Sequence, residues 1–135
     1  MTAFHHVAIS SADAEKSIRF YEQLGFRVVF RGAALQGGLT IIHMKLGDAL
    51  LEIFNCADPA PAPETAASLD SDLRRIGVKH FGLKVADIEK ALVEIKERGL
   101  AHDPKINEGR TGLKYIFIND PDGNWVEIVQ DDRGL

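Results

Sequence analysis

The fold of this chain is decided by a stretch of sequence that occurs twice. The segment "HHVAISSADAEKSIRFYEQLGF" at 5–26 aligns with "KHFGLKVADIEKALVEIKERGL" at 79–100 at an offset of 74 residues. Six of the 21 positions that start at His6 are identical, where average residue usage would give about one. The identical pairs are His6/His80, Ala12/Ala86, Asp13/Asp87, Glu15/Glu89, Lys16/Lys90 and Gly25/Gly99. The chain is therefore predicted to consist of two related halves.

Each half is predicted to have the element order β-α-β-β-β. The first helix begins after Ser11 or Asp13 as its N-cap and ends at Gly25, and the second helix covers 87–99. Alternating or continuous apolar runs bounded by turn residues indicate the strands. The predicted strands lie at 4–10, 26–30, 39–46 and 49–54 in the first half and at 79–85, 101–107, 113–119 and 124–130 in the second.

The predicted fold class is α+β, with two β-α-β-β-β modules in one domain. The first module covers 1–56, a proline-rich linker covers 57–76 with a short helix at 66–75, and the second module covers 77–135. A single module cannot bury both faces of its sheet. We therefore expect the two sheets to pair around a shared concave surface.

Two glutamates stand in apolar runs, where a buried carboxylate is costly unless its charge is compensated. Glu52 lies in "LLEIF" at 50–54, and Glu127 lies in "WVEIV" at 125–129. One interpretation is that both side chains point outward from edge strands. The repeat favours another interpretation, because the glutamates follow nearly the same offset as His6 and His80. Two imidazoles and two carboxylates suit a divalent metal ion, which would supply the missing positive charge.

The composition excludes several other classes of function. The chain has 135 residues, a net charge of −4 and no basic block, which argues against binding to nucleic acid or to an anionic membrane. Its first residues lack the features of a signal peptide, and no apolar run approaches the roughly 20 residues that span a bilayer. Cys56 is the single cysteine, so an internal disulfide is impossible. These features predict a cytoplasmic protein.

The sequence resembles the vicinal oxygen chelate superfamily, which includes glyoxalase I, bleomycin-resistance proteins, methylmalonyl-CoA epimerase and extradiol dioxygenases. The matching pieces are "FHHVAIS", "SIRFYEQLGF", "LLEIF", "VKHFGLKVADIEKAL" and "FINDPDGNWVEIVQ". The resemblance covers nearly the whole chain. It implies one divalent metal ion per site (Ni, Zn, Co, Mn or Fe), held by His6, Glu52, His80 and Glu127.

The resemblance further implies a glyoxalase I-like lyase or isomerase that acts on a small molecule with adjacent oxygens, through an enediolate-type intermediate. Glu127 would be the base, with Glu52 as its counterpart. A homodimer is expected, whose modules pair within or between chains. Many glutathione-using members carry an arginine where this chain has Ser10, and its linker is longer than the joint of bacterial glyoxalase I. Two alternatives are an extradiol-type dioxygenase, using two histidines and one glutamate on Fe(II), and a metal-free module that binds a drug.

Overall fold

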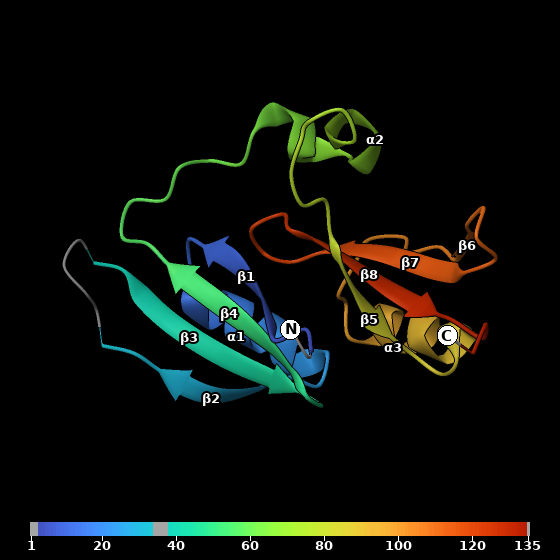
Figure 1. The fold of residues 1–135 in the computed structure, drawn as a ribbon, viewed down its shortest axis with the longest axis horizontal. Helices are drawn as coiled ribbons and strands as arrows, with labels where there is room; N and C mark the ends of the chain where they lie inside the picture. Colours follow the sequence, from blue (N-terminus) through green and yellow to red (C-terminus); the bar gives the residue numbers. More distant parts are fainter. Residues whose placement is uncertain (1–2, 34–37, 135) are drawn as a thin grey trace. The chain divides into compact units, whose positions relative to one another are not determined.

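The computed structural model describes residues 3–33 and 38–134. The chain divides into two compact units, Met1–Ala62 and Pro63–Leu135, and each is described below by itself. Both combine a mixed β-sheet with one longer helix (Figure 1). Within the described ranges, no helix is long and apolar enough to cross a membrane.

The first unit contains one four-stranded sheet and one helix. Its elements are β1 (His6–Ser11), α1 (Ala14–Gln23), β2 (Arg27–Arg31), β3 (Thr40–Leu46) and β4 (Ala49–Asn55). The strand order is β1-β4-β3-β2, with β1 parallel to β4 and the other neighbours antiparallel. The helix α1 follows β1 and is part of the long connection that parallel strands need. This connection allows β1 to lie beside β4 in parallel.

The second unit repeats this topology after two short helical turns. Its elements are the 3₁₀ turn η1 (Glu64–Ala67), α2 (Leu69–Asp72), β5 (Phe81–Lys84), α3 (Ile88–Glu97), β6 (Asn107–Glu108), β7 (Lys114–Asn119) and β8 (Trp125–Gln130). The strand order is β5-β8-β7-β6, with β5 parallel to β8. The predicted α+β class with two β-α-β-β-β modules is confirmed. The pairing of the two sheets around a concave site and the module boundaries at 56 and 77 stay predictions.

The repeated residues of the helices act at the helix ends. The carboxylate of Asp13 accepts a hydrogen bond from the backbone N–H of Lys16 at 3.1 Å, and Asp87 does the same with Lys90 at 3.0 Å. Each helix is followed by a glycine with positive φ, 93° at Gly25 and 64° at Gly99. These caps explain why aspartate and glycine recur at the same places in both halves.

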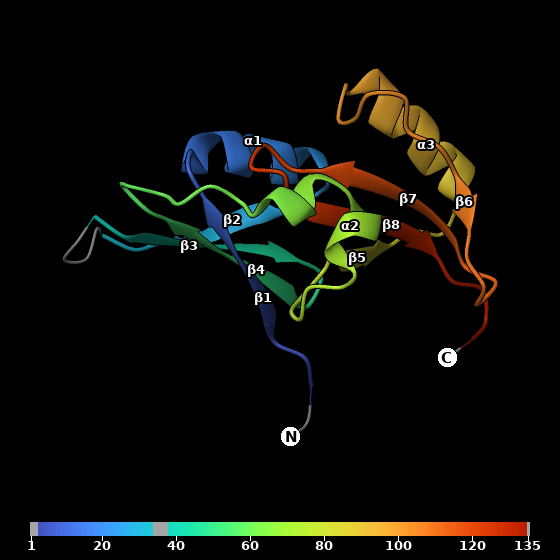
Figure 2. The same ribbon diagram turned by 90° about the horizontal axis from the view of Figure 1, so that it is seen from above.

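Each sheet buries one face against its own helix. The helix α1 contacts β2 and β4, and α3 contacts β7 and β8 (Figure 2). The buried hydrophobic residues of β3, β4, β7 and β8 alternate along the strands, as expected for a sheet with one covered face. They are Ile42, Met44, Leu51 and Ile53 in the first unit and Ile116, Ile118, Val126 and Ile128 in the second. The opposite face of each sheet carries Glu52 or Glu127, whose side chains are 19% exposed.

One predicted strand is wrong. The region 101–107 was expected to be a full strand, but β6 contains only Asn107 and Glu108. Pro104 lacks the N–H that a sheet ladder needs, and Asp103 has a positive φ of 50° that breaks the extended backbone. The short helix predicted at 66–75 is present as the separate turns η1 and α2.

Residues 63–76 are the part of the linker that belongs to the second unit, and they are called the interdomain segment below. This segment is fastened to the chain just before β5 through Asp72, a carboxylate only 5% exposed. Arg75 Nε donates to its Oδ1 at 2.7 Å, Lys79 Nζ donates to its Oδ2 at 2.8 Å, and Thr65 Oγ1 donates to Oδ1 at 2.9 Å. The hydrogen bonds from Arg75 and Lys79 hold the pKa of the Asp72 carboxyl well below its usual range.

We expect the substitution Asp72→Asn to lower the midpoint of urea unfolding at neutral pH. Because the pKa of Asp72 is lower in the folded chain than in the unfolded chain, its contribution to stability is complete above the ordinary pKa of about 3.9 and is lost as the pH falls below it. The difference in urea midpoint between the parent and Asp72→Asn should therefore shrink in acid. Asp70→Asn, at an exposed neighbour, is the control. Equal midpoints of parent and Asp72→Asn at pH 7 would contradict this account.

Candidate metal site

The first histidine–glutamate pair lies on neighbouring parallel strands. Ala8 of β1 faces Glu52 of β4 in the strand register, and His6 stands two residues earlier on the same face of β1. His6 Nε2 and Glu52 Oε2 are 3.7 Å apart. Sequence positions 46 residues apart are thereby brought next to each other by the parallel pairing of the strands.

The second pair repeats this arrangement. Gly82 of β5 faces Glu127 of β8, and His80 stands two residues before Gly82. The distance from His80 Nε2 to Glu127 Oε2 is 3.4 Å. A Cβ atom on Gly82 would lie 3.4 Å from that same oxygen. Small residues, Ala8 and Gly82, thus face both glutamates and leave space beside the carboxylates.

The two histidine rings are held in different ways. The Nδ1 atom of His6 is hydrogen-bonded to Nδ1 of His5 at 2.9 Å, so the Nε2 atom is the one turned toward Glu52. The ring of His80 packs edge-on against Phe117, with ring centroids 5.0 Å apart. A partner at the second ring nitrogen or against the ring face fixes the orientation of a histidine that binds a metal. His5, which the repeat predicts to be structural because it pairs with Lys79, contacts the candidate ligand itself.

Among the described residues, Glu52 and Glu127 have only histidines within ion-pair distance. No lysine or arginine of the ranges 3–33 and 38–134 forms an ion pair with either glutamate. A partly buried carboxylate without such a partner is costly unless another cation compensates its charge. Oxygen and imidazole donors suit a divalent ion of the first transition series, so the residues present fit such an ion.

The structure brings the four predicted ligands together two by two. His6 lies next to Glu52 in the first unit, and His80 lies next to Glu127 in the second. In the part of the chain that the structure describes, no group of three or more His, Cys, Asp or Glu side chains is arranged to hold a metal. The predicted four-ligand site would combine one pair from each unit, and it stays a prediction.

His43, which has no histidine partner in the repeat and is expected from the sequence to be a surface or core residue, lies next to Glu52. It faces Glu52 across the antiparallel pair β3–β4, and its Nε2 is 2.9 Å from Glu52 Oε1. The two-residue turn at 47–48 was a usable signal, because the turn length sets the register that places His43 opposite Glu52. The equivalent position opposite Glu127 is Phe117. Both oxygens of Glu52 thus have a histidine neighbour.

The comparisons with known proteins show the family to which the chain belongs. Residues 3–128 match the family model described as "Glyoxalase/Bleomycin resistance protein/Dioxygenase superfamily". The chain belongs to this superfamily, which confirms the resemblance of its sequence motifs.

Relatives are found among proteins and among solved structures. The chain is 31% identical over 132 residues to "Uncharacterized protein YwkD" of Bacillus subtilis (strain 168), which covers 96% of this chain and 98% of that protein. It is 28% identical to a lactoylglutathione lyase of Schizosaccharomyces pombe, covering 94% of this chain and 44% of the relative. The crystal structure of a glyoxalase family protein from Enterococcus faecalis superposes with a TM-score of 0.78 at 28% identity, over 95% of this chain and 97% of the other.

We expect His43→Phe, which copies the residue at the equivalent position of the second unit, to weaken metal binding by about tenfold, because hydrogen bonds to a ligand typically change metal affinity 10–100-fold. A competition titration with a chelating dye measures the affinity. His43→Gln, which retains a donor, should stay close to the parent. An unchanged affinity of His43→Phe would show that the bond to Glu52 has no part in metal binding.

Proposed function

We propose that this chain is a metal-dependent, glyoxalase-like lyase or isomerase that acts on a small molecule with two adjacent oxygens. The proposed ligands are His6, Glu52, His80 and Glu127, and the proposed ion is divalent, one of Ni, Zn, Co, Mn and Fe. A homodimer remains the predicted assembly. The substrate would present its two adjacent oxygens to the metal ion. Glutathione is not assumed to be the thiol.

The observation that carries the proposal is the identical construction of the two histidine–glutamate pairs. In both units the histidine stands two residues before a small residue, and that small residue faces the glutamate on the parallel neighbour strand. The carboxylates are equally exposed at 19% and lie at similar distances from the imidazoles, 3.7 and 3.4 Å. Two copies of this arrangement supply four donors of suitable chemistry.

The bound ion would supply a Lewis acid for the substrate oxygens. The role of the chain is then to move a proton between neighbouring carbons. We assign this role to Glu127, whose carboxylate would take the proton from one carbon and return it to the next. Glu52 has His43 at its second oxygen, whereas the residue opposite Glu127 is the apolar Phe117. Glu127 is therefore less restrained by its neighbours and better suited to exchange a proton.

The alternative of an extradiol-type dioxygenase requires two histidines and one carboxylate with open positions on Fe(II). Here both units supply a glutamate, so the donor set favours the lyase or isomerase. Oxygen consumption with a catechol would reverse this choice. A metal-free drug-binding module has no use for two preserved histidine–glutamate pairs, and metal analysis of the purified protein separates it from the first proposal.

We expect His80→Ala to remove most of the bound metal, because it deletes one of four donors while Glu127 keeps its place in β8. Elemental analysis of protein purified without added chelator gives the metal content per chain. His102→Ala, at an exposed histidine outside the proposed ligand set, should retain the parent content. Full occupancy in His80→Ala would place the metal elsewhere.

The substitution Glu127→Gln keeps an oxygen donor of similar size and removes nearly all basicity. Metal binding should weaken modestly, and turnover should fall by about 10²–10⁴-fold, the usual contribution of a positioned acid–base group. The rate is measured on a hemithioacetal with metal content determined in parallel.

Glu52→Gln is the matched control for the role of Glu127, since the repeat relates the two residues. If Glu127→Gln turns over at the parent rate with metal bound, Glu127 is a ligand only. If Glu52→Gln alone abolishes turnover, the base lies in the first unit.

A further inference from the structure

The second unit contains a pocket next to the candidate ligand His80. Its volume is about 470 Å³, within the range of pockets that hold small ligands. One wall is the open face of the sheet, where Tyr115 and Phe117 of β7 and Trp125 of β8 stand beside His80. The opposite wall is formed by Leu69 and other residues of the interdomain segment.

The wall from the interdomain segment is attached to the second unit at two points. The indole N–H of Trp125 donates a hydrogen bond to the backbone oxygen of Ala66 at 3.1 Å. At the other end, the carboxylate of Asp72 is bound by Lys79, the residue directly before His80. The segment that contains Leu69 and Leu73 is thus held over the aromatic face and is part of the second unit.

The aromatic wall forms a connected group. The rings of Tyr115 and Phe117 contact each other edge-on with centroids 5.2 Å apart, and Phe117 contacts Trp125 in the same way at 6.1 Å. Such ring edges and faces favour a further aromatic ring or a branched alkyl group. The two leucines on the opposite side offer apolar surface to the same group.

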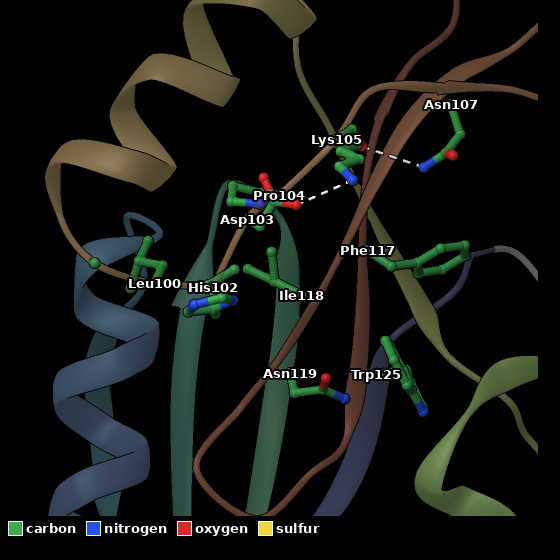
Figure 3. A pocket seen from close by; sticks show the side chains of 12 residues that line it. Leu100, His102, Asp103, Pro104, Lys105, Asn107, Phe117, Ile118, Asn119 and Trp125 are labelled. Carbon is green, nitrogen blue, oxygen red and sulfur yellow. Dashed lines mark hydrogen bonds and ion pairs between the residues drawn. The ribbon is translucent and has the colours of Figure 1, made fainter.

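The charged groups around the pocket do not favour an anion. Its lining contains no lysine or arginine, and Asp70 is its one carboxylate. A neighbouring cavity of about 680 Å³ shares Phe117 and Trp125 with it and extends toward Lys105 (Figure 3). There Lys105 Nζ is already paired with Asp103 Oδ2 at 3.0 Å. A carboxylate placed over the aromatic face would therefore lose water without gaining a lysine or arginine as partner.

We propose that this pocket binds the substituent of the substrate and selects an uncharged aromatic or branched alkyl group, with Leu69 and Leu73 as specificity-determining residues. The proposal rests on the proposed metal site, because His80 lies in the same pocket. A substrate with two adjacent oxygens would then carry its apolar substituent on the side of the second unit. An anionic substituent, such as the carboxylates of a peptide thiol, is disfavoured there.

Trp125 is the single tryptophan of the chain, so its fluorescence reports directly on entry into the pocket. The probes are benzohydroxamate and acetohydroxamate, which offer the same two adjacent oxygens to a metal and differ in the substituent. On the metal-loaded protein, benzohydroxamate should bind at least about tenfold more tightly, since burial of a ring removes a large apolar area from water. With 4-carboxybenzohydroxamate most of this advantage should disappear.

The double substitution Leu69→Ala and Leu73→Ala should reduce the preference for benzohydroxamate about fivefold and leave acetohydroxamate binding and metal content unchanged. Ile76→Ala is the matched control, because Ile76 lies in the same segment, is fully exposed and does not line the pocket. Equal binding of both hydroxamates to the parent, or an unchanged preference in the double variant, overturns the proposal.

A metal-free comparison separates this inference from the proposed metal site. In protein treated with chelator, 1-phenylethane-1,2-diol should change the fluorescence of Trp125 at millimolar concentration, and propane-1,2-diol should not. If the protein takes up no metal but responds to the phenyl diol, the metal site is wrong and the pocket stands. If metal binds and neither diol nor hydroxamate shows a preference, the pocket assignment is wrong and the metal site stands.

Discussion

The main constraint on each unit is a carboxylate that stands in a largely apolar strand, where burial of its charge is costly. Glu52 and Glu127 each stand between buried residues of a strand, with no lysine or arginine paired to them in the described part of the chain. The parallel pairing of the first and last strand brings a histidine to each glutamate, and this pairing requires the intervening helix. The caps of that helix and the packing of its buried face therefore serve the geometry of the histidine–glutamate pair.

The two units keep the same pair but surround it differently. In the first unit the hairpin partner of the glutamate is His43, which binds its second oxygen, and in the second unit it is Phe117, which packs against the histidine. A hydrogen bond restrains a carboxylate, whereas an apolar neighbour leaves its second oxygen without a donor. The two glutamates therefore differ in their surroundings: Glu52 is hydrogen-bonded to His43, and Glu127 has Phe117 at the equivalent position.

The interdomain segment, residues 63–76, belongs structurally to the second unit. Asp72 binds the side chains of Arg75 and Lys79, and Trp125 binds the backbone of Ala66. These contacts hold the segment as a wall beside the aromatic sheet face. The repeated modules thus supply the histidine–glutamate pair that both units share, and the unrepeated segment adds a surface to the second unit.

The duplicated β-α-β-β-β order could be predicted from the amino-acid sequence, because it follows from local patterns and from the repeat. The same repeat singles out His6, Glu52, His80 and Glu127, whose role as ligands stays a prediction, and it left both Ser11 and Asp13 as possible N-caps of the first helix. Most of the strand expected at 101–107 is missing, because the positive φ of Asp103 and the missing N–H of Pro104 keep this stretch out of the sheet. The bond of His43 to Glu52 and the attachment of the interdomain segment through Asp72 became apparent only in the folded chain. Both depend on which side chains meet across strands and turns, and a repeat carries no information about contacts that its two copies do not share.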